Sequence, residues 1–306
     1  MESMLATARR GHAGLFWMGI GMGALAVAIL LVSIVDLRQL LGAPLWFKPL
    51  KFAVSFTAYG LALAWMLGRL PAPALQRSGW VIVAASVIEV AIITGQAARG
   101  QLSHFNNDGG TGSLLFSIMG ATIVVLYLLT AAIAVRFLRE RSIEPDLVAA
   151  VRVGLGLTLV GMAVGFVMVG IGSHSVGVPD GGPGLPLIGW STTGGDLRIA
   201  HFVGLHALQL LPLLVAALAR FVPSVGLGTR MRMVRVVGLG YLGLIVVLTG
   251  QALRAQPLLT PDAVTLSALA VLALGTGLGL RAATRTTRTG APNAPQSSAV
   301  VLGQPR

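Results

Sequence analysis

Eight apolar segments dominate the chain, and each is close to the roughly 20 residues that a helix needs to cross a bilayer. They lie at about 13–35, 50–69, 78–98, 113–136, 148–172, 197–221, 232–253 and 262–280. Only 10% of the residues are charged, whereas a soluble domain has about 25%. Because lipid offers no partners to backbone polar groups, we expect an all-α integral membrane protein of about eight transmembrane helices.

The basic residues predict how the chain is oriented. Most of the 22 Lys and Arg residues fall at one set of helix ends, starting with Arg9 and Arg10 before the first segment. The positive-inside rule then predicts a multi-pass membrane protein with both termini in the cytoplasm. Residues 1–12 form the cytoplasmic N-terminus. Residues 281–306, rich in Thr, Arg, Pro and Ser, are expected to be a disordered cytoplasmic tail.

Charge and cysteine content exclude several kinds of site and partner. The net charge of +12 is spread over short connections, where orientation explains it, so we expect a lipid bilayer and no nucleic acid as partner. The chain has no Cys. Disulfides, thiolate metal sites, Cys-bound iron–sulfur clusters and Cys-attached haem are therefore excluded.

Two similar segments indicate an internal repeat. The pattern TGQAxRxQ occurs at 94–101 and again at 249–256, and Asp-Leu-Arg occurs at 36–38 and at 196–198. Both matches follow the same order along the chain. We therefore predict two parallel four-helix repeats, residues 13–140 and 147–280, related by an axis along the membrane normal.

The stretch 194–212 places several polar groups on one apolar helix. Asp196 is a candidate N-cap, and Arg198, His201 and His206 lie on one side of the helix that follows. Polar groups at this depth need protein, water or a ligand as partners. The simpler interpretation of these polar side chains is that they hydrogen-bond between packed helices. The more specific interpretation is a polar site at the outer face. The long outer loop 173–195 could fold over such a site.

The first functional hypothesis is an outward-facing pocket that binds or transports a small polar or anionic ligand, with proton linkage as an option. The predicted ligand contacts are Arg38, Lys51, Gln96, Arg99, Arg198, His206, Gln251 and Arg254. Glu89, in the middle of an apolar segment, and His201 are the predicted proton carriers, because an unpaired carboxylate there is costly. A neutral Glu89 that is hydrogen-bonded between helices is the alternative.

Residues 42–52, GAPLWFKPLKF, also have two interpretations. The favoured interpretation is an interfacial anchor, and the alternative is that Lys48 and Lys51 form a cationic wall for a carboxylate or an anionic head group.

The second hypothesis is a redox protein or enzyme that holds haem or a divalent metal through His104, His174, His201 and His206. His201 and His206 are five residues apart and do not form the i, i+4 pair of a zinc helix. A third hypothesis is a subunit of a membrane complex whose polar face docks a partner. Catalytic residues, ligand identity and oligomeric state do not follow from these patterns.

Three segments together resemble a group of uncharacterised bacterial polytopic integral membrane proteins. They are LGAPLWFKPLKFAVSF, QAARGQLSHFN and PDGGPGLPLIGWSTTGGDLRIAHFVGLHALQLLP. The resemblance covers most of the membrane portion and implies a bacterial cytoplasmic membrane, with no catalytic residue to carry over. The segments do not resemble the His-x-x-x-His hydrolases of the ceramidase type.

Overall fold

The computed structural model describes residues 4–69, 73–106 and 109–285. Within these residues, eight helices are long and apolar enough to cross a membrane, and the chain is a polytopic helical membrane protein. They are α2 (Ala13–Val35), α3 (Phe47–Leu67), α4 (Pro73–Ala98), α5 (Gly110–Leu138), α6 (Pro145–Ile171), α7 (Leu197–Phe221), α8 (Leu227–Leu253) and α9 (Ala263–Arg285). The short helix α1 (Met4–Gly11) precedes them.

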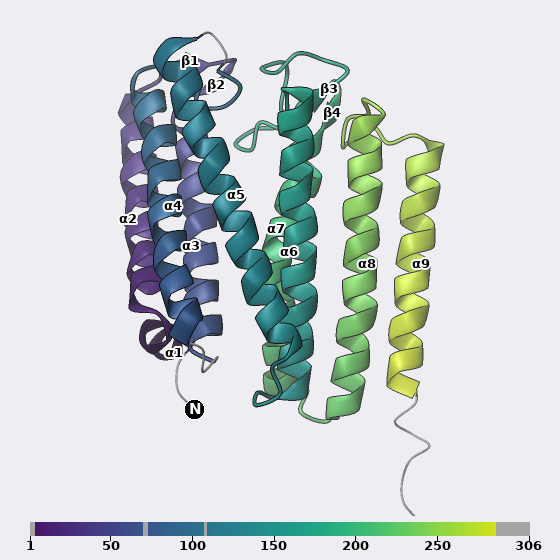
Figure 1. Cartoon of the computed structure of the whole chain (residues 1–306). Helices are drawn as coiled ribbons and strands as arrows, with labels where there is room; N and C mark the ends of the chain where they lie inside the picture. Colours follow the sequence, from purple (N-terminus) through teal and green to yellow (C-terminus); the bar gives the residue numbers. More distant parts are fainter. Residues whose placement is uncertain (1–3, 70–72, 107–108, 286–306) are drawn as a thin grey trace, which may run out of the picture.

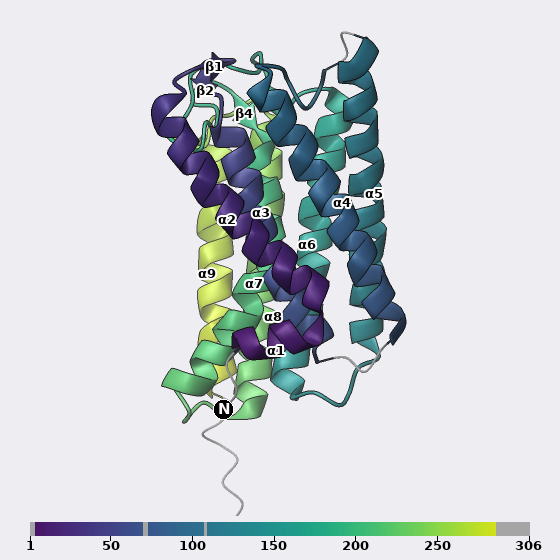
Figure 2. The same cartoon turned by 90° about the vertical axis from the view of Figure 1, so that its left-hand side faces the viewer.

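Successive long helices run in opposite directions, so their connections alternate between two ends of the molecule (Figure 1). One end holds the antiparallel pairs β1 (Gln39–Leu40) with β2 (Ala43–Pro44) and β3 (Ser175–Val176) with β4 (Gly195–Asp196), and we call it the lid end. The opposite end holds α1 and the last turn of α9, and we call it the tail end (Figure 2). Such alternation is expected for a chain that crosses a membrane eight times.

The helices pack in two groups with the same set of neighbours. In the first group, α2 packs on α3 and α4, α3 packs on α4, and α4 packs on α5. In the second, α6 packs on α7 and α8, α7 packs on α8, and α8 packs on α9. The two groups meet mainly where α3 faces α7 and where α5 faces α6. The predicted duplication remains a prediction, with which these neighbours are compatible.

Close packing of α6 on α7 depends on small residues. A Cβ atom on Gly161 would lie 2.7 Å from the backbone of Gly204, and one on Gly154 would lie 2.9 Å from the carbonyl oxygen of Ala207. The absence of side chains at these positions lets the two backbones approach, as small residues commonly do between membrane helices. The close approach fixes the position of the lid-end half of α7.

Several helix boundaries differ from the prediction. Helix α3 begins at Phe47 rather than near 50, because its first turn accepts Pro49, whose missing N–H is not needed there. Helix α8 begins at Leu227 rather than near 232 and so includes Arg230, which was expected in a connection. Helix α9 continues past 280 to Arg285, since Arg232 donates to the carbonyl of Ala283. The predicted disordered tail was therefore wrong for 281–285, and 286–306 lie outside the described residues.

Candidate functional site

The connection after α4 bends back into the helix bundle. Gln96 and Asn106 both donate a side-chain N–H to the carbonyl oxygen of Leu102, each at 3.0 Å. Ser103 and Asn106 are buried. These contacts hold residues 102–106 against the helices, and the half-buried ring of His104 lies toward Glu89.

Glu89 lies beneath His104 and is fully buried. Its Oε2 atom accepts a hydrogen bond of 2.9 Å from the hydroxyl of Thr122 on α5. Its Oε1 atom is buried with no hydrogen-bond partner among the described residues, and it lies 3.9 Å from Nε2 of His104. This distance exceeds the hydrogen-bond range, so the carboxyl group has unused capacity that faces the histidine.

The ring of His104 is surrounded by aromatic side chains. Its centroid lies 5.6 Å from that of Phe52, 6.3 Å from that of Phe105 and 6.1 Å from that of Phe116. Burial holds the pKa of His104 well below its usual value of 6.5, and the positive charge of Lys48 lowers the pKa further. His104 is therefore a neutral ring at physiological pH.

Lys48 and Lys51 reach the same region from the first turns of α3. The Nζ atom of Lys51 donates a hydrogen bond of 2.8 Å to the carbonyl oxygen of Ile188. Lys48 is half-buried and forms neither a hydrogen bond nor an ion pair with any described residue. The charged groups within electrostatic range of Lys48 are Lys51, Glu89, Asp180 and Arg198.

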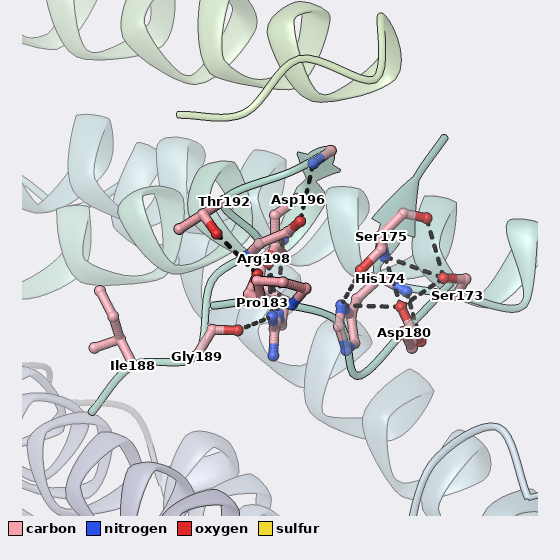
Figure 3. Close-up of polar contacts among 12 residues, drawn as sticks. Ser173, His174, Ser175, Asp180, Pro183, Ile188, Gly189, Thr192, Asp196 and Arg198 are labelled. Atoms are coloured by element: carbon pink, nitrogen blue, oxygen red, sulfur yellow. Dashed lines mark hydrogen bonds and ion pairs between the residues drawn. The ribbon is translucent and has the colours of Figure 1, made fainter. Parts of the chain in front are cut away.

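Residues 172–196, which we call the lid, form the roof of this region. One half of the lid is organised by Asp180, which accepts hydrogen bonds from the hydroxyl of Ser173 at 2.7 Å and the backbone N–H of Ser175 at 2.9 Å (Figure 3). Nδ1 of His174 lies 3.2 Å from the same carboxylate oxygen. Burial alone would raise the pKa of Asp180, but these contacts outweigh it and lower the pKa. Asp180 is therefore ionised.

His174 is neutral for a different set of reasons. Burial, followed by the charge of Arg198, lowers its pKa from 6.5 to about 4, although the carboxylates of Asp180 and Asp196 favour the protonated ring. Desolvation of the charged ring is the larger effect. The lid therefore presents an uncharged imidazole beside an ionised carboxylate.

The other half of the lid ends in a buried ion pair. Asp196 is 1% exposed and caps α7, and its carboxylate binds the guanidinium of Arg198 through two nitrogens (Figure 3). Arg198 also donates to the carbonyl oxygen of Gly189 at 2.6 Å, and Asp196 accepts from the backbone N–H of Ser191 at 2.9 Å. The charge of Arg198 is thus matched within the lid.

The lid connects the two groups of helices. The bond from Lys51 to Ile188 joins it to α3, and Gly181 lies against Leu41 in the β1–β2 turn. A Cβ atom on Gly181 would come within 2.8 Å of the Leu41 side chain, and Gly181 has a positive φ of 93°. Glycine is therefore required where the lid meets the first group.

These observations define one candidate site, the lid-end cluster. It consists of Lys48, Lys51, Glu89, His104, His174, Asp180 and Arg198. It contains five of the residues that the sequence predicted for ligand, proton or metal binding. Lys48, whose cationic-wall interpretation was the less favoured one, was missing from the predicted ligand contacts.

His201 lies beside the cluster, and His206 does not. Nδ1 of His201 donates to the carbonyl oxygen of Gly161 at 2.7 Å, because a carbonyl can only accept. Gly165 leaves space for the ring, since a Cβ atom there would lie 3.1 Å from it. His201 is within electrostatic range of His104. No described hydrogen bond, ion pair or ring contact connects His206 to the cluster.

The other predicted ligand residues lie at helix ends, and none of them has a described side-chain contact with a residue of the cluster. Arg38 pairs with Asp36 and is 53% exposed, and Arg254 lies 3.3 Å from a carboxylate oxygen of Asp262. Gln96 donates to Leu102, and Gln251 donates to the carbonyl oxygen of Pro257 at 2.8 Å. Arg99 is exposed on the surface. No described contact therefore brings these residues together in one pocket.

Comparison with protein families, curated proteins and solved structures finds no match to this chain. The metal prediction has no geometric support either. Among the residues that the structure describes, no three His, Cys, Asp or Glu side chains are placed to share one ion. His104 and His174 lie in the cluster as separate neutral rings.

Proposed function

We propose that the lid-end cluster binds a small anionic ligand and that the protein is a binding or transport protein for it. The observation that carries the proposal is Lys48. Lys48 is half-buried, and its ammonium group has no hydrogen bond or ion pair with a described residue, so its positive charge has no counter-charge in contact and is available to a ligand. An anion between Lys48 and the lid would supply that counter-charge.

The neighbouring cations support an anion at Lys48 rather than elsewhere in the cluster. Arg198 is held by Asp196 and Gly189, and Lys51 is held by the carbonyl of Ile188. Both still add positive potential at Lys48. The donors available to a ligand are therefore the Lys48 ammonium and ring nitrogens of the neutral histidines, which suit a carboxylate or a similar oxyanion.

The interior of the helix bundle is compatible with a transporter in which separate barriers at the two ends control passage of the ligand. Between the cluster and the tail end, the two groups of helices are joined by buried apolar side chains, among them Leu63, Leu126, Ile133, Leu155 and Leu208. At the lid end, the connection is a loop held by a few polar contacts. A thick apolar seal on one side and a thin polar lid on the other suit a transporter whose lid side opens first. We propose that the lid end faces the outside of a bacterial cytoplasmic membrane.

We also propose that the two groups arose by duplication. The matching TGQAxRxQ segments end their helices alike: Gln96 bonds the carbonyl of Leu102, and Gln251 bonds that of Pro257. The fourth residue after each glutamine has a positive φ, 68° in one copy and 57° in the other. The Asp-Leu-Arg match supports the proposal less, since Asp36 follows α2 whereas Asp196 caps α7.

A thermal-shift experiment tests anion binding. Purified protein in detergent is heated with sodium chloride, acetate, succinate or phosphate at constant ionic strength. A ligand at about 100 times its Kd adds about 2.7 kcal/mol of stability. We expect at least one anion to raise the Tm of the wild type by several degrees, to have no such effect on Lys48→Met, and to act again on Lys48→Arg.

The matched control is Arg235→Gln, which removes an exposed positive charge on α8 toward the tail end. It should respond to the anion as the wild type does. Equal responses of Lys48→Met and the wild type, or no response to any of these anions, would contradict the proposal.

A further inference from the structure

Glu89 is the carboxyl group of the lid-end cluster with the fewest described hydrogen-bond partners. Asp180 is bound by Ser173, Ser175 and His174, and Asp196, next to the cluster, is bound by Arg198. Glu89 has a single hydrogen bond, from Thr122, and its second oxygen has no partner among the described residues. Its protonation state is therefore the least constrained of the three.

The titratable groups that face Glu89 are few. Lys48 lies within electrostatic range from α3, and His104 approaches to 3.9 Å from the connection after α4. Helix α5 contributes only the hydroxyl of Thr122. His174 and His201 lie farther off, within electrostatic range of His104. Because His104 is a neutral ring, the Lys48 ammonium is the positive charge that an ionised Glu89 would balance.

From this placement, we infer that the anion and a proton on Glu89 occupy the lid-end cluster together, so that the protein takes up one proton with each anion. The inference rests on the proposed anion site at Lys48. When Glu89 is ionised, its negative charge opposes an anion near Lys48 and partly neutralises the ammonium. When Glu89 carries a proton, the anion is the remaining counter-charge for Lys48.

The coupling is reciprocal by thermodynamic linkage. If protonation of Glu89 strengthens anion binding, a bound anion must strengthen proton binding by the same factor. The geometry supplies a route for the proton, since Oε1 of Glu89 lies 3.9 Å from Nε2 of His104 and a small movement of either side chain would bring the two atoms into hydrogen-bond contact. His104 thus transfers the proton between the lid side and Glu89 and does not keep it.

The test measures protons and anions in the same sample. Protein in weakly buffered detergent solution is mixed with the anion identified by the thermal-shift experiment, drawn from chloride, acetate, succinate and phosphate. A pH-sensitive dye records proton uptake, and titration of the Tm shift records anion affinity. Above the pH at which Glu89 ionises, we expect uptake of about one proton per anion and an affinity that falls about tenfold per pH unit.

Two variants assign the proton. Glu89→Gln keeps the shape and the Thr122 contact, and it should bind the anion with no proton uptake and no pH dependence. His104→Gln should keep proton uptake at equilibrium but slow it. The C=O stretch of a protonated carboxyl in the infrared spectrum, present in the wild type and absent in Glu89→Gln, checks the assignment without any ligand.

The outcomes separate the two proposals. Anion binding without proton uptake in the wild type overturns the inference and leaves the anion site standing. Proton uptake that persists in Glu89→Gln, or that is lost only in His104→Gln, overturns the assignment to Glu89. If no anion binds, both proposals fail.

Discussion

At the scale of residues, the two Asp–Arg ion pairs of the repeated Asp-Leu-Arg pattern differ in their role because they differ in burial. Asp36–Arg38 and Asp196–Arg198 have nearly the same geometry, with closest nitrogen–oxygen distances of 2.7 and 2.6 Å. In the first pair the Arg38 side chain is 53% exposed, and pairs near the surface contribute little to stability. The second is buried and organises the lid. The sequence shows the repeated Asp-Leu-Arg but contains no signal for this difference, because burial is decided by the lid.

A prediction at this scale concerns His174. Its folded-state pKa of about 4 lies below the ordinary 6.5, so the unfolded chain binds a proton first as the pH falls. The contribution of His174 to stability is therefore complete above pH 6.5 and is lost progressively toward pH 4. Nuclear magnetic resonance of histidine-labelled protein, with His174→Gln to assign the signal, should show titration near pH 4. Titration near pH 6.5 would contradict the buried lid.

Residue-level prediction from sequence singled out groups that are costly in lipid, but it did not anticipate side chains that bond a carbonyl close by in the chain. Glu89 stands out because a carboxylate in an apolar helix needs an explanation. Gln96 and Gln251 were predicted as ligand contacts, yet each bonds a carbonyl only six residues further along. Short-range helix capping accounts for these side chains, and a sequence pattern alone does not distinguish capping from ligand binding.

At the scale of elements, the α6–α7 pair supports the lid. The lid connects the end of α6 to the start of α7, so the spacing of these helices determines where His174 and Asp180 lie. Their contact depends on the facing glycines Gly161 and Gly204. A helix period predicts which residues share a face, but a glycine-rich span offers several such faces, and only the packed structure shows which one is used.

Substitution of these glycines tests the role of the contact. Gly204→Ala places a methyl group against the backbone of Gly161, and overpacking of this kind costs about 1–3 kcal/mol. We expect a lower Tm and, because α7 shifts, weaker anion binding. The control is Gly156→Ala on α6, where the added methyl meets nothing within 4 Å. A Gly204→Ala protein as stable as Gly156→Ala would contradict the account of this helix pair.

At the scale of the whole molecule, the number of spans was predictable and the site was not. Eight apolar segments give eight helices because lipid permits few alternatives. The lid-end cluster combines α3, α4, two connections and α7, so it exists only once the two groups of helices meet. Its charges are individually visible in the sequence, whereas their convergence depends on the re-entrant connection that carries His104 and on the lid.

The central claim is that the Lys48 ammonium binds an anion that enters from outside the cell. Because the chain has no Cys, Lys48→Cys carries a single thiol that can be modified selectively. A membrane-impermeant thiosulfonate with a trimethylammonium group, added to intact cells, would restore a positive charge there. A methyl thiosulfonate would give a neutral control.

The measurement is the anion-induced Tm shift of Lys48→Cys purified after each treatment. We predict no shift for the unmodified protein and for the protein that carries the neutral methylthio group, and a restored shift after cationic modification from outside. A thiol that the reagent reaches only after the cells are permeabilised would contradict the outward orientation. Anion binding that is the same in all three samples would contradict the role of Lys48.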